Sequence, residues 1–185
     1  MREKTIAVNA LHGLAELLTA NVLTSHGVPA SSVHFVVVPF PAMGVALIVH
    51  RVDAAFMTEP FLSAVEVGHG VVPVSGIDQR AAQDVPIAGY VTTREWAAMY
   101  PRTAAAFARA LSRGHQVAAT SRATVEQATI RALHISRGTA GVMALGSCPL
   151  TTTASDLERA AVLMQDNGQL PWSVHTGVLV PGMFR

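Results

Sequence analysis

Short apolar runs alternate with helix-spaced apolar residues along the first half of the chain. The runs Thr5–Val8, Val33–Val38 and Val52–Phe56 are apolar along most of their length, and a turn or a proline-containing loop follows each of them. The apolar residues after the first run recur at the spacing of one helix face: Leu14, Leu17, Leu18, Val22 and Leu23. Apolar strands joined by helices are typical of a parallel sheet that is buried on both faces. The pattern therefore predicts an α/β fold.

Capping residues, glycines and prolines indicate where the first helices begin and end. We expect Asn9 to cap the first helix, Gly27 to end it and Pro29 to prevent its continuation. A tight loop, Pro39-Phe40-Pro41, is expected to lead into a short apolar helix that runs through Leu47.

Shorter elements are predicted in the next part of the chain. A helix is expected at Pro60–Val67, ended by Gly68, and a strand at Val71–Val74. The polar segment Asp78–Gln83 is expected to form a turn or a short helix.

Helices dominate the second half. Pro86–Val91 is the last predicted strand, and Thr92 with Glu95 forms a capping box that starts a helix. Three longer helices are predicted: Arg102–Ala119, Ser121–Leu133 and Ser155–Asp166. A glycine-punctuated connection, Gly138–Gly146, separates the last two, and the end of the chain, Pro171–Arg185, is expected to be irregular.

Composition narrows the classes of function. The 185 residues are 50% hydrophobic and 14% charged, with a net charge of +1. The arginines are spread over the predicted helices, so nucleic-acid binding is not expected. The single cysteine, Cys148, rules out an internal disulfide and is expected to be a small buried hydrophobe. The low charged fraction indicates either a large buried area or an apolar surface that a partner covers.

Several function classes lack their usual sequence signals. The eight histidines show no paired spacing, so we expect no metal and no cofactor. No serine-nucleophile signature occurs, and we expect no catalytic residues. The chain as given begins without a secretion-signal pattern and has no run of eighteen apolar residues, so we expect it in the cytoplasm.

Candidate ligand contacts follow the ends of the three predicted strands, where ligands bind in sheets of this kind. The candidates are Asn9, Ala10, Leu11, His12, Pro39, Phe40, Met43, Thr58 and Glu59. The first four precede a helix whose dipole favours an anion, although they also suit a plain N-cap. The next three form either an apolar wall or core packing. Glu59 could receive a ligand amine or hydroxyl, or cap the next helix, whereas Asp53 is expected to bond backbone N–H groups.

Motifs spread over most of the chain resemble one family. They are KTIAVNAL at 4–11, VPFPAM and AL within 38–47, RVDAAFMTEPF at 51–61, the segment 86–111 and DLERAAVLMQDNGQL at 156–170. In this order they resemble type 2 periplasmic solute-binding proteins of ABC transporters, in the branch that includes sulfonate- and taurine-binding and NMT1/THI5-like proteins. The resemblance implies an α/β ligand-binding lobe at 1–85, with a return strand and a mainly helical portion of the other lobe at 86–185. We expect the N-terminal part of that fold to be missing.

The resemblance also implies a function. It points to the substrate-binding component, or a fragment of it, of an ABC importer for a small organic solute such as a sulfonate, a nitrate-like anion or a thiamine-pyrimidine precursor. The alternatives are an enzyme or enzyme relic of thiamine-pyrimidine or menaquinone-type metabolism, and a ligand-sensing domain, because one fold serves all three.

The implied partners are the solute and, for a full-length form, an ABC permease. We also expect a homo-oligomer, formed through an exposed sheet edge or through the C-terminal segment. A longer parent protein would be extracytoplasmic or a membrane-anchored lipoprotein.

Overall fold

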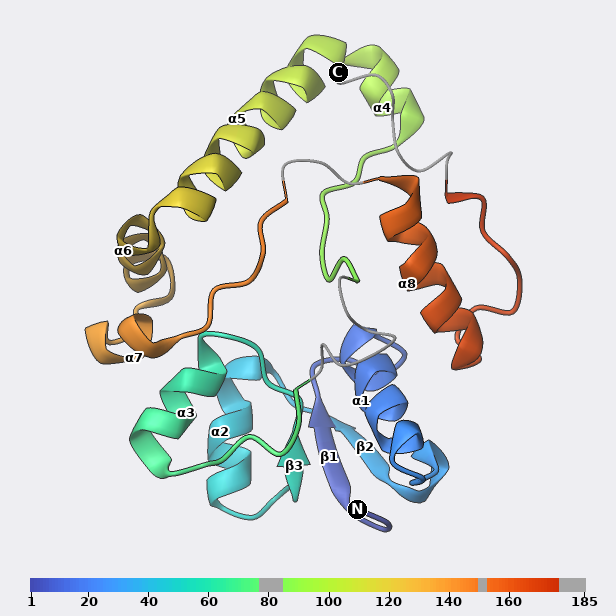
Figure 1. Ribbon diagram of the computed structural model, residues 1–185, viewed down its shortest axis with the longest axis vertical. Coiled ribbons are helices and arrows are strands. Elements are labelled where there is room, and N and C mark those ends of the chain that lie inside the picture. The colour runs from blue at the N-terminus through green and yellow to red at the C-terminus, as the bar shows by residue number, and fades with distance from the viewer. Residues whose placement is uncertain (77–84, 150–152, 177–185) are drawn as a thin grey trace.

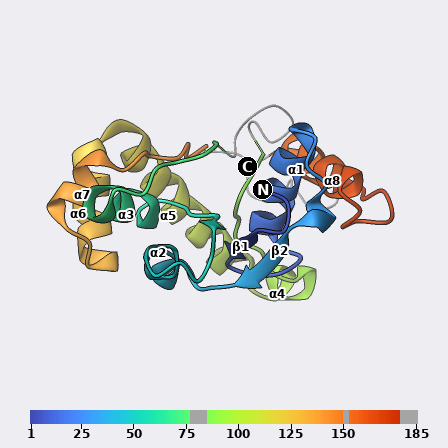
Figure 2. The ribbon, with the colours of Figure 1, turned by 90° about the horizontal axis from the view of Figure 1, so that it is seen from below.

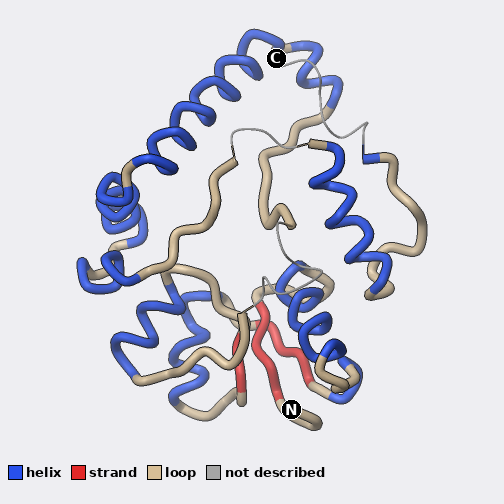
Figure 3. Tube along the Cα trace, viewed as in Figure 1, coloured by secondary structure: helices blue, strands red, loops and turns tan. Residues whose placement is uncertain are grey.

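A small parallel sheet lies at one end of the molecule (Figure 1). The computed structural model describes residues 1–76, 85–149 and 153–176. Its strands are β1 (Thr5–Val8), β2 (His34–Val37) and β3 (Ala54–Ala55), and Figure 3 shows them side by side among the helices. β1 pairs in parallel with both neighbours, in the order β2-β1-β3. The prediction of an α/β fold with a parallel sheet is therefore confirmed.

The middle strand turns its side chains alternately toward two helix layers. Ile6 and Val8 pack with residues of α1 (Leu14–Ser25). Ala7 points the other way and packs with α2 (Phe40–Ile48). Because successive side chains of a strand point to opposite faces, α1 and α2 cover opposite sides of the sheet. The sheet is thus doubly wound, and its middle strand is buried on both faces, which explains why β1 is apolar.

The first helix begins later than predicted. Its N-cap is Gly13 rather than Asn9. The intervening residues form a turn in which His12 has a φ of 55°. The end of the helix follows the prediction, because Gly27 adopts a φ of 73° just after it.

The proline-rich segment after β2 belongs to a helix. Pro39-Phe40-Pro41 was predicted as a loop, but Pro39 is the N-cap of α2 and Pro41 lies in its first turn. Proline is tolerated there because the first N–H groups of a helix have no helical acceptor.

Close packing joins α2 to α3 (Phe61–His69). A Cβ atom at Gly44 would overlap Cγ2 of Val65, so the absence of a side chain at Gly44 sets how closely the two helices approach. α3 ends at Gly70, which has a φ of 65°, and not at Gly68 as predicted.

Two predicted strands are not formed. Val71–Val74 and Pro86–Val91 have no strand structure, and neither pairs with the sheet that the structure describes. Val74 is 84% exposed and Val91 is 96% exposed. β-branched residues favour a strand mainly through contacts with neighbouring strands, and these segments have no such neighbour in the described parts of the chain.

β3 covers two residues, so it is shorter than the predicted run Val52–Phe56, although Val52 and Phe56 are buried on either side of it. The predicted turn at Asp78–Gln83 lies outside the described residues.

Within the described residues, five more helices follow α3. They are α4 (Arg94–Met99), α5 (Pro101–Thr120), α6 (Arg122–Leu133), α7 (Arg137–Val142) and α8 (Ala154–Asp166). Tyr100 ends α4 and precedes α5, and Ser121 caps α6 by accepting a hydrogen bond from the N–H of Thr124, both as predicted. The predicted end of α8 is also confirmed at Asn167, with Gly168 at a φ of 69°.

Other local predictions in this half were wrong. Thr93, not Thr92, caps α4 by accepting from the N–H of Trp96. The expected connection Gly138–Gly146 contains most of α7. The capping box that starts α8, made by Thr153 and Asp156, was not predicted. Cys148 is half-buried rather than buried.

The helices after the sheet form an arch (Figure 1). α4 and α5 lie far from the sheet, and α6 and α7 bring the chain back to α3. α8 lies beside α1, and its Leu163 joins the core under that helix. Figure 2 shows the same two groups from below, with α6 and α7 beside α3 and α8 beside α1. The division of the chain at residue 85 into two lobes stays a prediction.

Candidate functional site

Three loops with candidate ligand contacts meet at one edge of the sheet. Because the three strands are parallel, the segments 9–12, 39–43 and 58–60 all follow strands that end at the same edge. We call this edge the carboxyl edge. We call the segments the three strand-end loops, although 39–43 is the N-cap and first turn of α2. The chain moves from β1 to β2 on one side and then crosses to β3 on the other, which makes β1 the point where the winding reverses. Ligands of open α/β sheets bind at such a point.

The first loop is exposed, and the carboxylate of Glu16 offsets part of the positive end of the α1 dipole beside it. Asn9, Ala10, Leu11 and His12 are all exposed. The backbone N–H of His12 donates to Oε2 of Glu16 over 2.8 Å. This carboxylate sits at the start of α1, where the helix dipole favours negative charge. An anionic ligand at this turn would therefore compete with Glu16 for the N–H groups at the start of α1. Glu16 was not among the residues predicted to contact a ligand.

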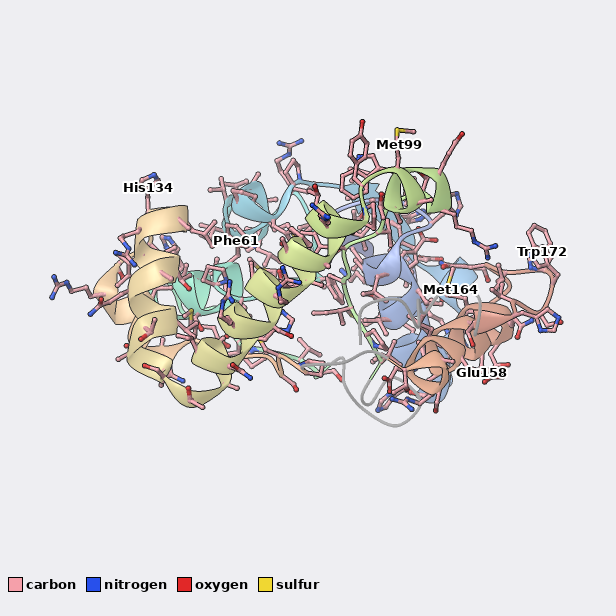
Figure 4. The ribbon with its side chains drawn as sticks, turned by 90° about the horizontal axis from the view of Figure 1, so that it is seen from above. Phe61, Met99, His134, Glu158, Met164 and Trp172 are labelled. Atoms are coloured by element: carbon pink, nitrogen blue, oxygen red, sulfur yellow. The ribbon has the colours of Figure 1, made fainter. Side chains whose placement is uncertain are left out.

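The second loop contributes an aromatic surface and a core residue. Phe40 is half-buried and stacks on Phe61 of α3, with ring centroids 6.1 Å apart and planes 10° apart. Figure 4 places Phe61 between α2 and α3. Pro39 is exposed beside this pair. Met43 is 0% exposed and packs beneath the sheet. Of the two roles predicted for Met43, core packing is therefore the correct one.

The third loop is held by Glu59. Its Oε2 accepts the N–H of Ser63 over 3.2 Å, and its Oε1 accepts the Ser63 hydroxyl over 2.9 Å. Oε1 also accepts the backbone N–H of Ala144 over 3.0 Å. The Glu59–Pro60 peptide bond is cis, and Thr58 is half-buried.

Glu59 therefore has a structural role in this conformation. It caps the first turn of α3 and ties that turn to the segment that follows α7. A ligand amine or hydroxyl would contact Glu59 by replacing one of these donors. The sequence could have indicated the bond to Ser63, which lies one helical turn on, but it carried no signal for Ala144.

Two carboxylates away from the carboxyl edge, Asp53 and Asp156, have structural roles. Asp53 lies at the opposite edge of the sheet, where it accepts from Lys4 Nζ and from the N–H of Thr5, each over 2.9 Å. These two hydrogen bonds, the Lys4 bond first, hold the pKa of Asp53 below its ordinary value of 3.8. The predicted bonding of Asp53 to backbone N–H is confirmed. Hydrogen bonds from Thr153 likewise lower the pKa of Asp156 at the start of α8.

In the parts of the chain that the structure describes, no three His, Cys, Asp or Glu side chains gather closely enough to hold a metal ion. No helix within 1–76, 85–149 or 153–176 has both the length and the apolar character needed to cross a membrane.

Comparison with known protein families adds an independent observation. Residues 2–133 match the NMT1-like family, which is more than two thirds of the chain. The chain belongs to the NMT1-like family. The match contains all nine candidate residues of the carboxyl edge, and it ends before α7 and α8. No curated protein and no solved structure matches the chain significantly.

Membership of the NMT1-like family supports a solute-binding or related function in general. Proteins of this family are typically binding proteins, which agrees with the expectation of a non-catalytic role. The family match supports the part of the sequence resemblance that pointed to NMT1/THI5-like proteins.

Proposed function

We propose that this NMT1-like protein binds a small organic solute at the carboxyl edge without transforming it. The observation that carries the proposal is the meeting of three strand-end loops at the reversal point of a doubly wound sheet. A solute bound there would touch residues from all three loops at once. Binding of this kind needs an apolar wall and a few fixed polar groups.

The loops offer distinct chemistry to such a solute. The stacked, half-buried rings of Phe40 and Phe61 offer apolar contact. The turn at Asn9–His12 gives an amide side chain and backbone groups at the start of α1, and Thr58 gives a hydroxyl. A solute with one planar or alkyl part and one polar or anionic group matches this set. Sulfonates, nitrate-like anions and thiamine-pyrimidine precursors all fall within that description.

The same proposal assigns the chain a place in a transport system. The chain would act as the substrate-binding component of an ABC importer and deliver the solute to a permease. Residues 86–185 would belong to the other lobe of a type 2 solute-binding fold, and closure of the two lobes would bury the solute.

Calorimetric titration tests the proposal. The probes are taurine, nitrate and 4-amino-5-hydroxymethyl-2-methylpyrimidine, each added to the purified chain. We expect one of them to bind, and we expect Asn9→Ala and Thr58→Ala to weaken that binding by about tenfold each, as for a lost ligand hydrogen bond. His34→Ala is the matched control, because His34 is exposed at the other end of the same sheet.

Two results would contradict the proposal. One is the absence of heat with all three probes at millimolar concentration. The other is a binding probe whose affinity falls as much with His34→Ala as with Asn9→Ala, because that would place the bound solute away from the carboxyl edge.

We also propose that the chain self-associates. Large apolar side chains are exposed on the segments that follow α3 and α8: Val72, Val74, Tyr90, Val91 and Trp172. With 14% charged residues, the chain has few groups to keep such surfaces solvated. We expect light scattering to give a mass of two or more copies of 19.4 kDa at micromolar concentration. A monomer mass across the whole concentration range would contradict this expectation.

A further inference from the structure

A groove lies on the flank of α1. Of the nine candidate residues of the carboxyl edge, only His12 lines it. Its volume is about 580 Å³, within the range of small-molecule sites. Three parts of the chain line it. They are the first half of α1 with the turn before it, the segment 30–35 that runs into β2, and the end of α8 with the turn after it. Their lining residues include Glu16, Ala20, Phe35, Met164 and Asn167.

We propose that this groove is a second binding site, for a small organic cation with an apolar body, such as an alkyl- or arylammonium ion. The charge of the lining favours a cation. Among the described residues that line the groove, Glu16 is the one carboxylate, and neither lysine nor arginine occurs. A cation would gain from this charge, whereas an anion would be repelled.

Glu16 is held in place with one oxygen left for a ligand. It is half-buried, and its Oε2 accepts the backbone N–H of His12 over 2.8 Å. Within the described residues, Oε1 makes no hydrogen bond to the protein. A carboxylate fixed through one oxygen loses little freedom when the other binds an ammonium group, and charge-assisted hydrogen bonds are the stronger kind.

The rest of the lining divides into apolar and polar parts. Phe35 and Met164 are half-buried and Val33 is buried, and together they offer contact to an alkyl or aryl body. Figure 4 shows Met164 on the side of α8 nearer to α1, and Glu158 on the opposite side. The aromatic ring of Phe35 can also attract a cation, and the thioether of Met164 is a favourable neighbour for an aryl ring.

Polar groups from α8 and the β2 approach complete the set. Asn167 donates its Nδ2 to the carbonyl of Leu163 over 2.9 Å, which leaves its Oδ1 as an acceptor. Ser31 and Gln169 line the same groove with a hydroxyl and an amide. An ammonium group has only donors, and each of these three side chains has an oxygen that can accept a hydrogen bond from it.

The site differs in chemistry from the carboxyl edge. The carboxyl edge offers an aromatic pair, the Asn9 amide and the Thr58 hydroxyl to a solute, whereas Glu16 gives the groove a negative charge. The two share His12, whose backbone N–H bonds Glu16. The proposal for the groove goes beyond the proposed function and stands even if no solute binds at the carboxyl edge.

Three probes of matched shape test the proposal. Phenethylammonium chloride, 2-phenylethanol and 3-phenylpropionate are titrated into the purified chain, with calorimetry or ligand-observed NMR as the readout. We expect the ammonium ion to bind about tenfold more tightly than the alcohol, since it adds a charge-assisted hydrogen bond, and the carboxylate to bind more weakly still. Equal affinity for the three probes would overturn the proposal.

Substitutions then locate the binding. Glu16→Gln keeps an acceptor for the His12 N–H but removes the charge, and we expect it to weaken phenethylammonium binding by about tenfold. Glu66→Gln is the matched control, because Glu66 is also half-buried on a helix but lies on α3. Ala20→Leu narrows the groove without changing its charge, and it should weaken the ammonium ion and the alcohol alike.

Circular dichroism of each variant establishes that the fold is intact, and Ala20→Leu provides the test if Glu16→Gln does not fold. Wild-type affinity in folded Glu16→Gln would overturn the proposal. An equal loss in Glu66→Gln would do the same, because the effect would then not come from the groove.

Discussion

The two halves of the molecule keep their shape by different means. In the sheet half, residues 1–76, three of the four residues of β1 are buried, and helices cover both faces. In the helical half, residues 86–149, α5 is twenty residues long and buries Ala104, and α6 buries none of its residues. The sheet half is stabilised by apolar burial, whereas the helical half depends more on caps and single hydrogen bonds.

The charges show the same contrast. The helical half carries seven arginines and two glutamates, so it is strongly basic, while the rest of the chain is acidic overall. On α5, Arg102, Arg109 and Arg113 share one face, because they are seven and four residues apart. The opposite face carries Ala104 and Leu111. The near-neutral total charge therefore hides two halves of opposite sign.

The largest expected effect comes from the core of the sheet half. Met43→Ala removes a side chain that is 0% exposed and leaves a cavity, which should lower the free energy of unfolding by about 2–5 kcal/mol. Phe107→Ala, in the helical half, removes a side chain that is 50% exposed and touches Tyr90 edge-on, at a cost of about 1 kcal/mol. Urea denaturation followed by circular dichroism measures both. Equal losses would show that the two halves are packed alike.

A smaller effect is expected at the bond that joins the two halves. Glu59→Ala leaves the N–H and hydroxyl of Ser63 and the N–H of Ala144 without their carboxylate, which should cost about 1–3 kcal/mol. Hydrogen exchange should rise at Ala144 and in the first turn of α3. Glu66→Ala, on the same helix, is the control and should change neither measurement. Unchanged exchange at Ala144 in Glu59→Ala would mean that this bond does not connect the halves in solution.

Caps should matter locally in the helical half. Ser121→Ala removes the acceptor for the N–H of Thr124 and should destabilise α6 by about 1 kcal/mol. Hydrogen exchange should increase within α6 and stay unchanged in β1. Ser112→Ala, inside α5, is the comparison, and it should not increase exchange because alanine is the better helix former. An equal increase in β1 would show that the halves unfold together.

The smallest effect is a pH dependence at the far edge of the sheet. The pKa of Asp53 is lowered in the folded state, so its bonds to Lys4 and Thr5 contribute stability above the ordinary value of 3.8. That contribution is lost as pH falls through the lowered folded pKa. The stability difference between the wild type and Asp53→Asn should therefore be present at pH 5 and shrink below pH 3.8. Urea titrations at a series of pH values measure it, and a difference that grows on acidification would contradict the assignment.

Features encoded by neighbouring residues were predictable from the sequence. The parallel sheet followed from three apolar runs separated by helix-spaced leucines, and α5 and α6 followed from Pro101 and Ser121. The meeting of the three candidate loops also followed, because parallel strands end at one edge. These signals act within a few residues or through the topology alone.

Features that depend on distant neighbours were not predictable. Val71–Val74 and Pro86–Val91 have the composition of strands, but strand structure needs a partner that the described chain does not place beside them. Whether Met43 faces the core or the carboxyl edge depends on where α2 begins. The segment Pro39–Pro41 was predicted as a loop, but α2 begins directly after Pro39, and Met43 faces the core. The bond from Ala144 to Glu59 joins residues 85 positions apart, and no local pattern marks it.

The close approach of α2 and α3 has a consequence for how the chain tolerates change. At Gly44 even a methyl group would overlap the Val65 side chain, which is 8% exposed, so either that side chain or the helix that carries it would have to shift. Val45, the next residue, is 62% exposed on the same helix. In a saturation mutagenesis library selected for soluble expression, we expect nearly every variant at position 44 to disappear, while most variants at position 45 persist.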